Sequence, residues 1–231
     1  MSGVRRALVL RPEPGNARTL AALRARGIEG VGVPLFAVRA LEWRVPAAED
    51  FDALLLTSAN AVRAAGAGLA ALSALPVVAV GAATAAAAQT AGLRVVVTGR
   101  GDAAAVVAAA GAFPRLLHLT GREHVAVPGV ARAIVYASEA VAMSPAALAG
   151  AVDGVVLLHS ARAAGRFVEL AADLPRARVR VAALSAGVAA AAGGGWARTI
   201  VADAPNDARL VAAAMLAIDP ARGRGDNAGH E

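Results

Sequence analysis

The chain has 231 residues, no cysteine and no lysine, so all 23 of its basic residues are arginines. These counts exclude a disulfide framework, thiolate metal or redox chemistry, a Schiff-base lysine and a P-loop lysine. The formal net charge of +6 suits an anionic ligand, but the arginines are scattered and aromatic residues make up only 3% of the chain. We therefore expect a small anionic ligand and no nucleic-acid partner.

An uncharged stretch, 64–93, is long enough to raise the possibility of a membrane span. Pro76 and several glycines and polar residues divide it, and alanine contributes little to membrane insertion. The apolar run Ala7–Leu10 near the chain start is too short for a signal peptide. We expect a cytoplasmic protein without membrane contact.

Short apolar runs alternate with alanine-rich helical patterns along the whole chain. The apolar runs predict strands over 7–10, 31–36, 53–56, 77–80, 95–97, 116–119, 155–158, 179–184 and 199–202. Capping residues and glycine stops predict helices over 15–27, 82–91, 102–110, 161–172, 186–192 and 207–218. A further helix is predicted after Thr57-Ser58, fading over 66–75, and another is predicted to start at Ser144-Pro145. The alternation indicates an α/β fold with parallel sheets flanked by helices.

The second half of the chain repeats features of the first. Asp52 opens a strand–turn–helix stretch that returns at Asp153, and the Gly81 and Ser185 turns each precede a four-alanine run. A third pair, Asp102 and Asp207, follows at nearly the same spacing. We infer two similar domains.

The second copy lacks one βα unit at its end, and the βα unit at the start of the chain supplies it. One domain is therefore expected to be discontinuous in sequence. One domain is expected to comprise residues 1–36 and 143–218, and the other residues 47–133. The extended segments 37–46 and 134–142 are expected to form a two-stranded hinge, and 219–231 is expected to be a disordered tail.

Small polar residues follow nearly every predicted strand. In parallel α/β sheets, ligands bind beyond the carboxyl ends of the strands, where helix N-termini offer free N–H groups. These candidate substrate-binding residues are Arg11, Thr57, Ser58, Asn60, Gly81, Thr84, Thr98, His159, Ser160, Ser185 and Asn206. They include no paired carboxylates, no nucleophile beside a base and no cluster of metal ligands, so we expect no metal.

Each of these residues also has a simpler interpretation. Ser, Thr and Asn cap helices in most proteins, so a single one does not indicate a ligand site. Tyr136, the only tyrosine, lies on the proposed hinge and would be a neutral hydrogen donor at pH 7. It could equally be an amphipathic strand residue that packs in the core.

Several ordered motifs resemble those of the uroporphyrinogen-III synthase family. They are Leu10-Arg11-Pro12-Glu13, Pro34-Leu35-Phe36, Leu56-Thr57-Ser58-Ala59-Asn60-Ala61-Val62, Val80-Gly81-Ala82-Ala83-Thr84-Ala85, Val135-Tyr136 and Ala204-Pro205-Asn206-Asp207. The resemblance extends to about Ile218 and depends on the order and spacing of the motifs.

This resemblance implies two hinged α/β domains with a cleft that binds the acetate and propionate groups of a linear tetrapyrrole. The implied reaction, which needs no cofactor, removes a hydroxyl from hydroxymethylbilane to give an azafulvene, passes through a spiro intermediate and closes the macrocycle with ring D inverted. By the same resemblance, Tyr136 assists departure of the hydroxyl, and Thr84 and Ser160 contact the substrate. Val188 replaces a family threonine, which leaves Ser185 as the hydroxyl there.

We expect the chain to act as a monomer on this small-molecule substrate. A non-enzymatic two-domain protein that binds a small polyanion is the alternative, because its hinge, cleft and donors would look alike.

Overall fold

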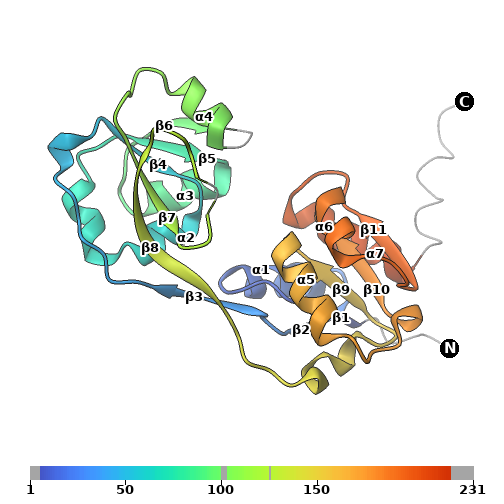
Figure 1. The fold of residues 1–231 in the computed structure, drawn as a ribbon. Coiled ribbons are helices and arrows are strands. Elements are labelled where there is room, and N and C mark those ends of the chain that lie inside the picture. Colours follow the sequence, from blue (N-terminus) through green and yellow to red (C-terminus); the bar gives the residue numbers. More distant parts are fainter. Residues whose placement is uncertain (1–5, 100–102, 125, 220–231) are drawn as a thin grey trace, which may run out of the picture. The chain divides into compact units, whose positions relative to one another are not determined.

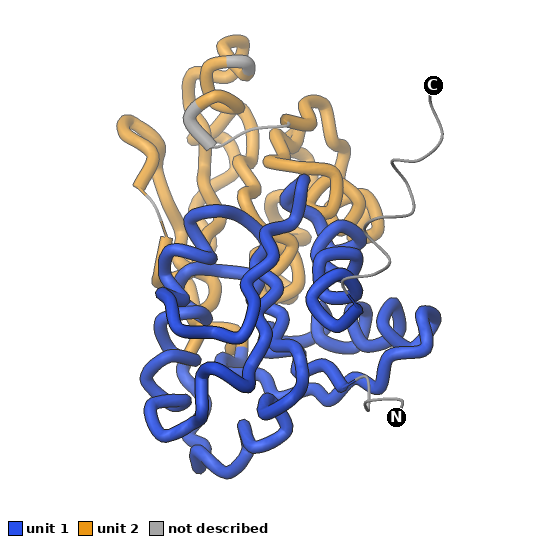
Figure 2. The backbone as a smooth tube through the Cα atoms, turned by 90° about the vertical axis from the view of Figure 1, so that its right-hand side faces the viewer, with its two compact units in different colours: residues 1–37, 140–231 blue, residues 38–139 orange. Residues whose placement is uncertain are grey.

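The computed structural model describes residues 6–99, 103–124 and 126–219 (Figure 1). The predicted cap Asp102 and all of the predicted tail except Asp219 lie outside these residues. The chain divides into two compact units (Figure 2). Unit 1 contains the described residues up to Ala37 and from Ala140 onward, and unit 2 is Val38–Glu139. The chain passes between them within strands β3 and β8, which are neighbours in one sheet.

Unit 1 is built on a five-stranded sheet with the order β11-β10-β9-β1-β2. Its strands are β1 (Arg6–Val9), β2 (Glu29–Gly32), β9 (Val155–Leu158), β10 (Arg180–Ala183) and β11 (Arg198–Val201). All of their recorded pairings are parallel. The helices are α1 (Gly15–Arg24), α5 (Ala161–Leu170), α6 (Ala186–Ala192) and α7 (Asp207–Ile218), with short 3-10 turns η3 (Pro145–Ala151) and η4 (Arg176–Arg178).

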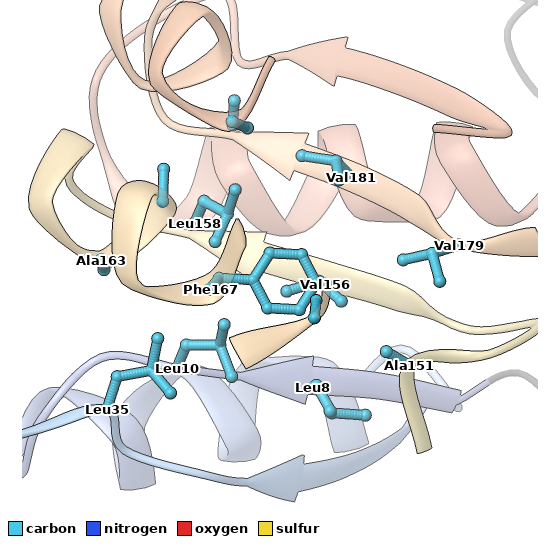
Figure 3. Packing of buried hydrophobic residues seen from close by; sticks show 14 of the residues in the cluster. Leu8, Leu10, Leu35, Ala151, Val156, Leu158, Ala163, Phe167, Val179 and Val181 are labelled. Atoms are coloured by element: carbon cyan, nitrogen blue, oxygen red, sulfur yellow. The ribbon is translucent and has the colours of Figure 1, made fainter. Parts of the chain in front are cut away.

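Alternate residues of the unit 1 strands face opposite sides of the sheet, as the two-residue period of a strand requires. Leu8, Leu10 and Val156 point to a core that α5 and α6 cover, with Phe167 at its centre (Figure 3). Ala7, Val9 and neighbouring residues on the other face pack against α1 and α7. The central strands β1, β9 and β10 are therefore buried on both faces, which explains their continuous apolar runs.

Unit 2 contains a six-stranded sheet with the order β3-β8-β7-β4-β5-β6. The strands are β3 (Phe36–Ala40), β4 (Ala53–Leu56), β5 (Val77–Val80), β6 (Val95–Gly99), β7 (Leu116–Gly121) and β8 (Ala131–Ala140). The helices are α2 (Ala59–Ala64), α3 (Ala82–Thr90) and α4 (Ala103–Ala109), with the 3-10 turns η1 (Ala48–Asp50) and η2 (Gly66–Leu72).

Five strands of the unit 2 sheet, β6-β5-β4-β7-β8, repeat the order β11-β10-β9-β1-β2 of the unit 1 sheet, and β3 is the additional strand. The helices match as well, except for one. Between β1 and β2 the chain forms α1, whereas between β7 and β8 it forms no helix in the part of 122–130 that the structure describes. The corresponding face of sheet 2 is covered by α4, with Val127 and Val130 packed against its core.

Three predicted elements differ from the structure. The helix predicted from Ser144-Pro145 is the short 3-10 helix η3. The strand predicted over 31–36 is instead β2, which starts at Glu29 and pairs with β1, and Phe36 already belongs to β3. A Cβ atom on Gly30 would lie 2.7 Å from Leu20 of α1, so glycine allows the helix to pack close to this strand. The helix predicted after Ser58 is short, because α2 ends at Ala64 and the chain continues as η2.

Candidate functional site

The predicted site residues lie at the carboxyl edge of the two sheets. In unit 1 they follow β1, β9, β10 and β11, and in unit 2 they follow β4 and β5 or lie within β6 and β8. Because the recorded strand pairs are parallel, the residues of each unit are brought to one edge of its own sheet.

Four of the predicted residues are N-caps. The side chains of Ser58, Ser160, Ser185 and Asn206 accept backbone N–H groups at 3.1, 3.2, 3.4 and 3.0 Å, respectively. Each side chain satisfies one of the helix's orphan donors and leaves others available for an anion. Gly81 precedes α3 with φ of 90°, a backbone conformation that favours glycine.

Asp207, the first residue of α7, organises the carboxyl edge of unit 1. Its Oδ1 accepts hydrogen bonds from Thr19 Oγ1 at 2.8 Å, His159 Nε2 at 2.9 Å and Arg11 Nη1 at 3.1 Å. Burial opposes ionisation of this carboxyl, but these partners outweigh it and the pKa of Asp207 lies below its ordinary value. The guanidinium of Arg11 is therefore paired within the protein.

His159 is a neutral member of this cluster at pH 7. Burial lowers the pKa of its imidazole, and the side chain is only 9% exposed. Because the Asp207 carboxylate can only accept, Nε2 carries the ring proton. The other nitrogen, Nδ1, is buried and has no hydrogen-bond partner among the described residues.

The carboxyl edge of unit 2 has a different polar group. Thr57 Oγ1 and His118 Nε2 lie 2.9 Å apart and share a hydrogen bond. His118, on β7, is 3% exposed, and burial together with the nearby His124 lowers its pKa to about 4. His118 is therefore uncharged at neutral pH.

Tyr136 lies beside Gly121, its partner in the β7–β8 register. A Cβ atom on Gly121 would lie 2.6 Å from the Tyr136 ring and 3.0 Å from its hydroxyl oxygen. The ring also packs against the apolar core of unit 2. The hydroxyl forms no hydrogen bond within the part of the chain that the structure describes.

The remaining predicted residues differ in accessibility. Thr98 is exposed at the end of β6, and Thr84 in α3 is only 5% exposed. Asn60 accepts a hydrogen bond from Arg63 one turn later in α2. Two cavities of about 400 and 360 Å³ lie in unit 2, and no predicted site residue lines either one.

Sequence reasoning missed the central role of Asp207 and the contributions of Thr19, Gly121 and His124. In the sequence, Asp207 looks like an ordinary acidic residue in the first turn of a helix. Its position after a predicted strand was the one signal that it could belong to the site. Thr19 gave no signal, because its hydroxyl reaches Asp207 only once α1 and α7 have packed on the same face of the sheet.

Comparison with protein-family models matches residues 17–212 to the model described as uroporphyrinogen-III synthase HemD. This match covers most of the chain. The chain belongs to the uroporphyrinogen-III synthase family.

Solved structures of this family share the fold. The uroporphyrinogen-III synthetase of Helicobacter pylori 26695 has a TM-score of 0.66 at 15% identity, over 91% of this chain and 98% of that chain. A mutant uroporphyrinogen III synthase of the extremely thermophilic bacterium Thermus thermophilus has a TM-score of 0.53 at 16% identity, over 94% and 99%. No curated protein sequence matches the chain.

The family match confirms the resemblance seen in the sequence motifs, and the solved structures confirm the α/β class predicted from the alternation of strands and helices. Among the described residues, no helix is long and apolar enough to cross a bilayer.

Proposed function

We propose that the chain cyclises hydroxymethylbilane to uroporphyrinogen III, with loss of water and inversion of ring D. The observation that carries this proposal is the family match over residues 17–212. The enzyme is then a lyase of tetrapyrrole and haem biosynthesis. Its contribution lies mainly in folding the linear substrate and placing charge, because the reaction needs no covalent attachment to the protein.

Helix N-termini are the proposed sites for the substrate carboxylates. Each can favour an anion by about 0.3–1 kcal/mol, and several acting together would hold a polyanion. The strongest candidates are α3, α5 and α7, whose N-cap residues are Gly81, Ser160 and Asn206. Arg11 is already paired with Asp207. This pairing supports a role for Arg11 in orienting the site more than in direct neutralisation of a substrate carboxylate.

Tyr136 is the proposed proton donor to the departing hydroxyl. Its position at the carboxyl edge of unit 2 and its hydroxyl, which makes no hydrogen bond to the described residues, support this role. General acid catalysis requires such a group within hydrogen-bond reach of the leaving oxygen.

We also propose the compartment in which the chain acts, the kind of ligand it binds and its oligomeric state. The role in tetrapyrrole biosynthesis supports action in the cytoplasm on a small molecule, and the scattered arginines support action without nucleic acid. A monomer is proposed, which light scattering coupled to gel filtration would test directly.

The deciding experiment is an isomer assay. Purified protein is mixed with freshly prepared hydroxymethylbilane, and the oxidised products are separated by chromatography. We expect the type III isomer, whereas the spontaneous reaction without enzyme gives type I. Formation of type I alone, at the rate of the buffer control, would falsify the proposed function.

A further inference from the structure

His124 lies in the segment that replaces a helix between β7 and β8. Its Nδ1 is 2.9 Å from the carbonyl oxygen of Gly121 and 3.3 Å from that of Arg122. Because a carbonyl oxygen can only accept a hydrogen bond, Nδ1 carries the ring proton. In the neutral ring Nε2 then has a free lone pair, and no described residue forms a hydrogen bond with it. The residue is partly exposed, so this nitrogen is not enclosed by the core.

Gly121 brings His124 and Tyr136 together. The carbonyl of Gly121 holds the imidazole, while the Tyr136 ring lies over its Cα so closely that a Cβ atom there would clash. The Arg122 N–H also donates to the Tyr136 carbonyl oxygen at 2.8 Å, which ties the segment to β8. An imidazole nitrogen and a phenol thus flank a single residue at the carboxyl edge of sheet 2.

The ring of His118 packs edge-to-face with the imidazole of His124. The two ring centroids are 6.2 Å apart and the rings are nearly perpendicular. Nε2 of His118 is already paired with Thr57, and its ring is buried. His124 differs from His118 in that it is partly exposed, so its Nε2 can reach a substrate, whereas the His118 ring is enclosed in the core.

We propose that His124 is a second proton-transfer group of this site, acting as the base that complements Tyr136. This inference rests on the proposed function. The cyclisation needs one proton donor and one proton acceptor, and these two side chains would supply them from the same edge of one unit. Neither the sequence motifs nor the family match assigns His124 this role.

The C–O bond of the hydroxymethyl group breaks as the oxygen takes the Tyr136 proton and leaves as water. The ring D carbon that forms the last C–C bond loses its proton to Nε2 of His124. The imidazolium then returns one proton through solvent to the phenolate, so the net reaction releases one water and leaves the enzyme unchanged.

Two substitutions separate this role from a structural one. His124→Asn keeps an amide N–H that can donate to the Gly121 carbonyl, but it has no nitrogen that accepts a proton. His124→Ala removes both features. We expect both variants to lower kcat for type III formation about ten-fold or more, with KM within about two-fold of wild type. Added imidazole should restore part of the activity of His124→Ala. A wild-type kcat in His124→Asn would show that the residue only fixes the segment, and would overturn the proposal.

Two further measurements keep the test sharp. Two-bond proton–nitrogen NMR correlations on histidine-labelled protein should place the His124 proton on Nδ1, and a proton on Nε2 would overturn the proposal without reference to activity. Wild-type enzyme is assayed in parallel. If it yields only type I product, the proposed function fails, whereas type III product from wild type and His124→Asn at equal rates defeats only the role of His124. Urea unfolding followed by Trp43 fluorescence, in a Trp196→Phe background, checks that unit 2 still folds in each variant.

Discussion

The carboxyl edges of the two sheets are built on the same strand order but carry different polar groups. In unit 1, a charged cluster centres on Asp207, which satisfies Arg11, Thr19 and His159 at once. In unit 2, the residues at the matching edge, Thr57, His118, His124 and Tyr136, contain no carboxylate–arginine pair. The ion pair of unit 2 that starts β4, Asp52 with Arg115, lies at the opposite end of its strand.

This difference indicates a division of labour between the units. Charges that neutralise one another hold a structure in place, whereas neutral donors and acceptors without partners remain available to a substrate. We therefore expect substitutions in the unit 1 cluster to act mainly on stability, and substitutions of His124 and Tyr136 at the unit 2 edge to act on turnover. The Thr57–His118 pair of unit 2 is internally hydrogen-bonded, so we expect it to act on stability as well. Each unit has its own tryptophan, Trp196 in unit 1 and Trp43 in unit 2, so their stabilities can be followed separately after substitution of the other tryptophan by phenylalanine.

The largest expected effect is the pH dependence of unit 2 stability. The folded-state pKa of His118, about 4, lies below the ordinary value of 6.5, so its contribution is complete above pH 6.5 and is lost as the pH falls toward 4. The loss should reach about 3 kcal/mol in the free energy of unfolding reported by Trp43. His118→Gln should remove most of this pH dependence. A slope that persists in that variant would mean that another group is responsible.

The next effect concerns Asp207. Asp207→Asn removes the charge that pairs with Arg11 and weakens the acceptor of His159, so the unit 1 transition reported by Trp196 should lose about 2 kcal/mol. Asp173→Asn is the matched control, because this exposed carboxylate has no hydrogen bond to the described residues, and it should change stability by less than about 0.5 kcal/mol. Equal effects of the two substitutions would contradict the central role of Asp207.

Tyr136→Phe tests the catalytic side of the comparison. The ring remains on Gly121 while the proton is removed, so kcat for type III formation should fall about ten-fold, equivalent to about 1.4 kcal/mol, with the Trp43 transition unchanged. Unchanged kinetics would show that Tyr136 serves only to pack against β7.

The smallest effects are expected from the helix caps. Ser160→Ala should cost unit 1 about 1 kcal/mol, whereas Ser58→Ala should cost unit 2 about 0.5 kcal/mol, because α2 has only six residues and depends less on its cap. Threonine at either position should recover most of the loss. A larger cost at Ser58 than at Ser160 would reverse this ranking of the two helices.

Much of the fold could be predicted from local sequence. The run Val155–Leu158 followed by Ser160 gives β9 and α5 almost residue for residue, because a buried parallel strand needs a continuous apolar run and the next helix needs a cap. β2 could not be found this way. Glu29 and Gly30 have low strand propensity, and their conformation is set by pairing with β1 and by the close approach of α1.

The candidate site was less accessible to sequence reasoning. A cap such as Asn206 can be recognised from its immediate sequence neighbours. The contacts of Asp207, in contrast, join residues that are 48 to 196 positions apart. Only the sheet order, which puts β1 beside β9, brings them together. The role proposed for His124 could not be predicted either. Its imidazole is oriented by a hydrogen bond to the backbone carbonyl of Gly121, in a stretch whose described part, within 122–130, forms no helix.

The insertion of unit 2 between two segments of unit 1 also determines the order of folding during biosynthesis. β1 is synthesised before unit 2, but its partner β9, which pairs Val155 with Ala7, is synthesised only after unit 2. At typical elongation rates this delay is on the order of ten seconds. Unit 2, whose strands are contiguous in the chain, can close in that interval, while the apolar strand β1 waits for its neighbour. During that interval β1 therefore has only one of its two strand neighbours, β2, and the apolar edge that β9 later covers is left open.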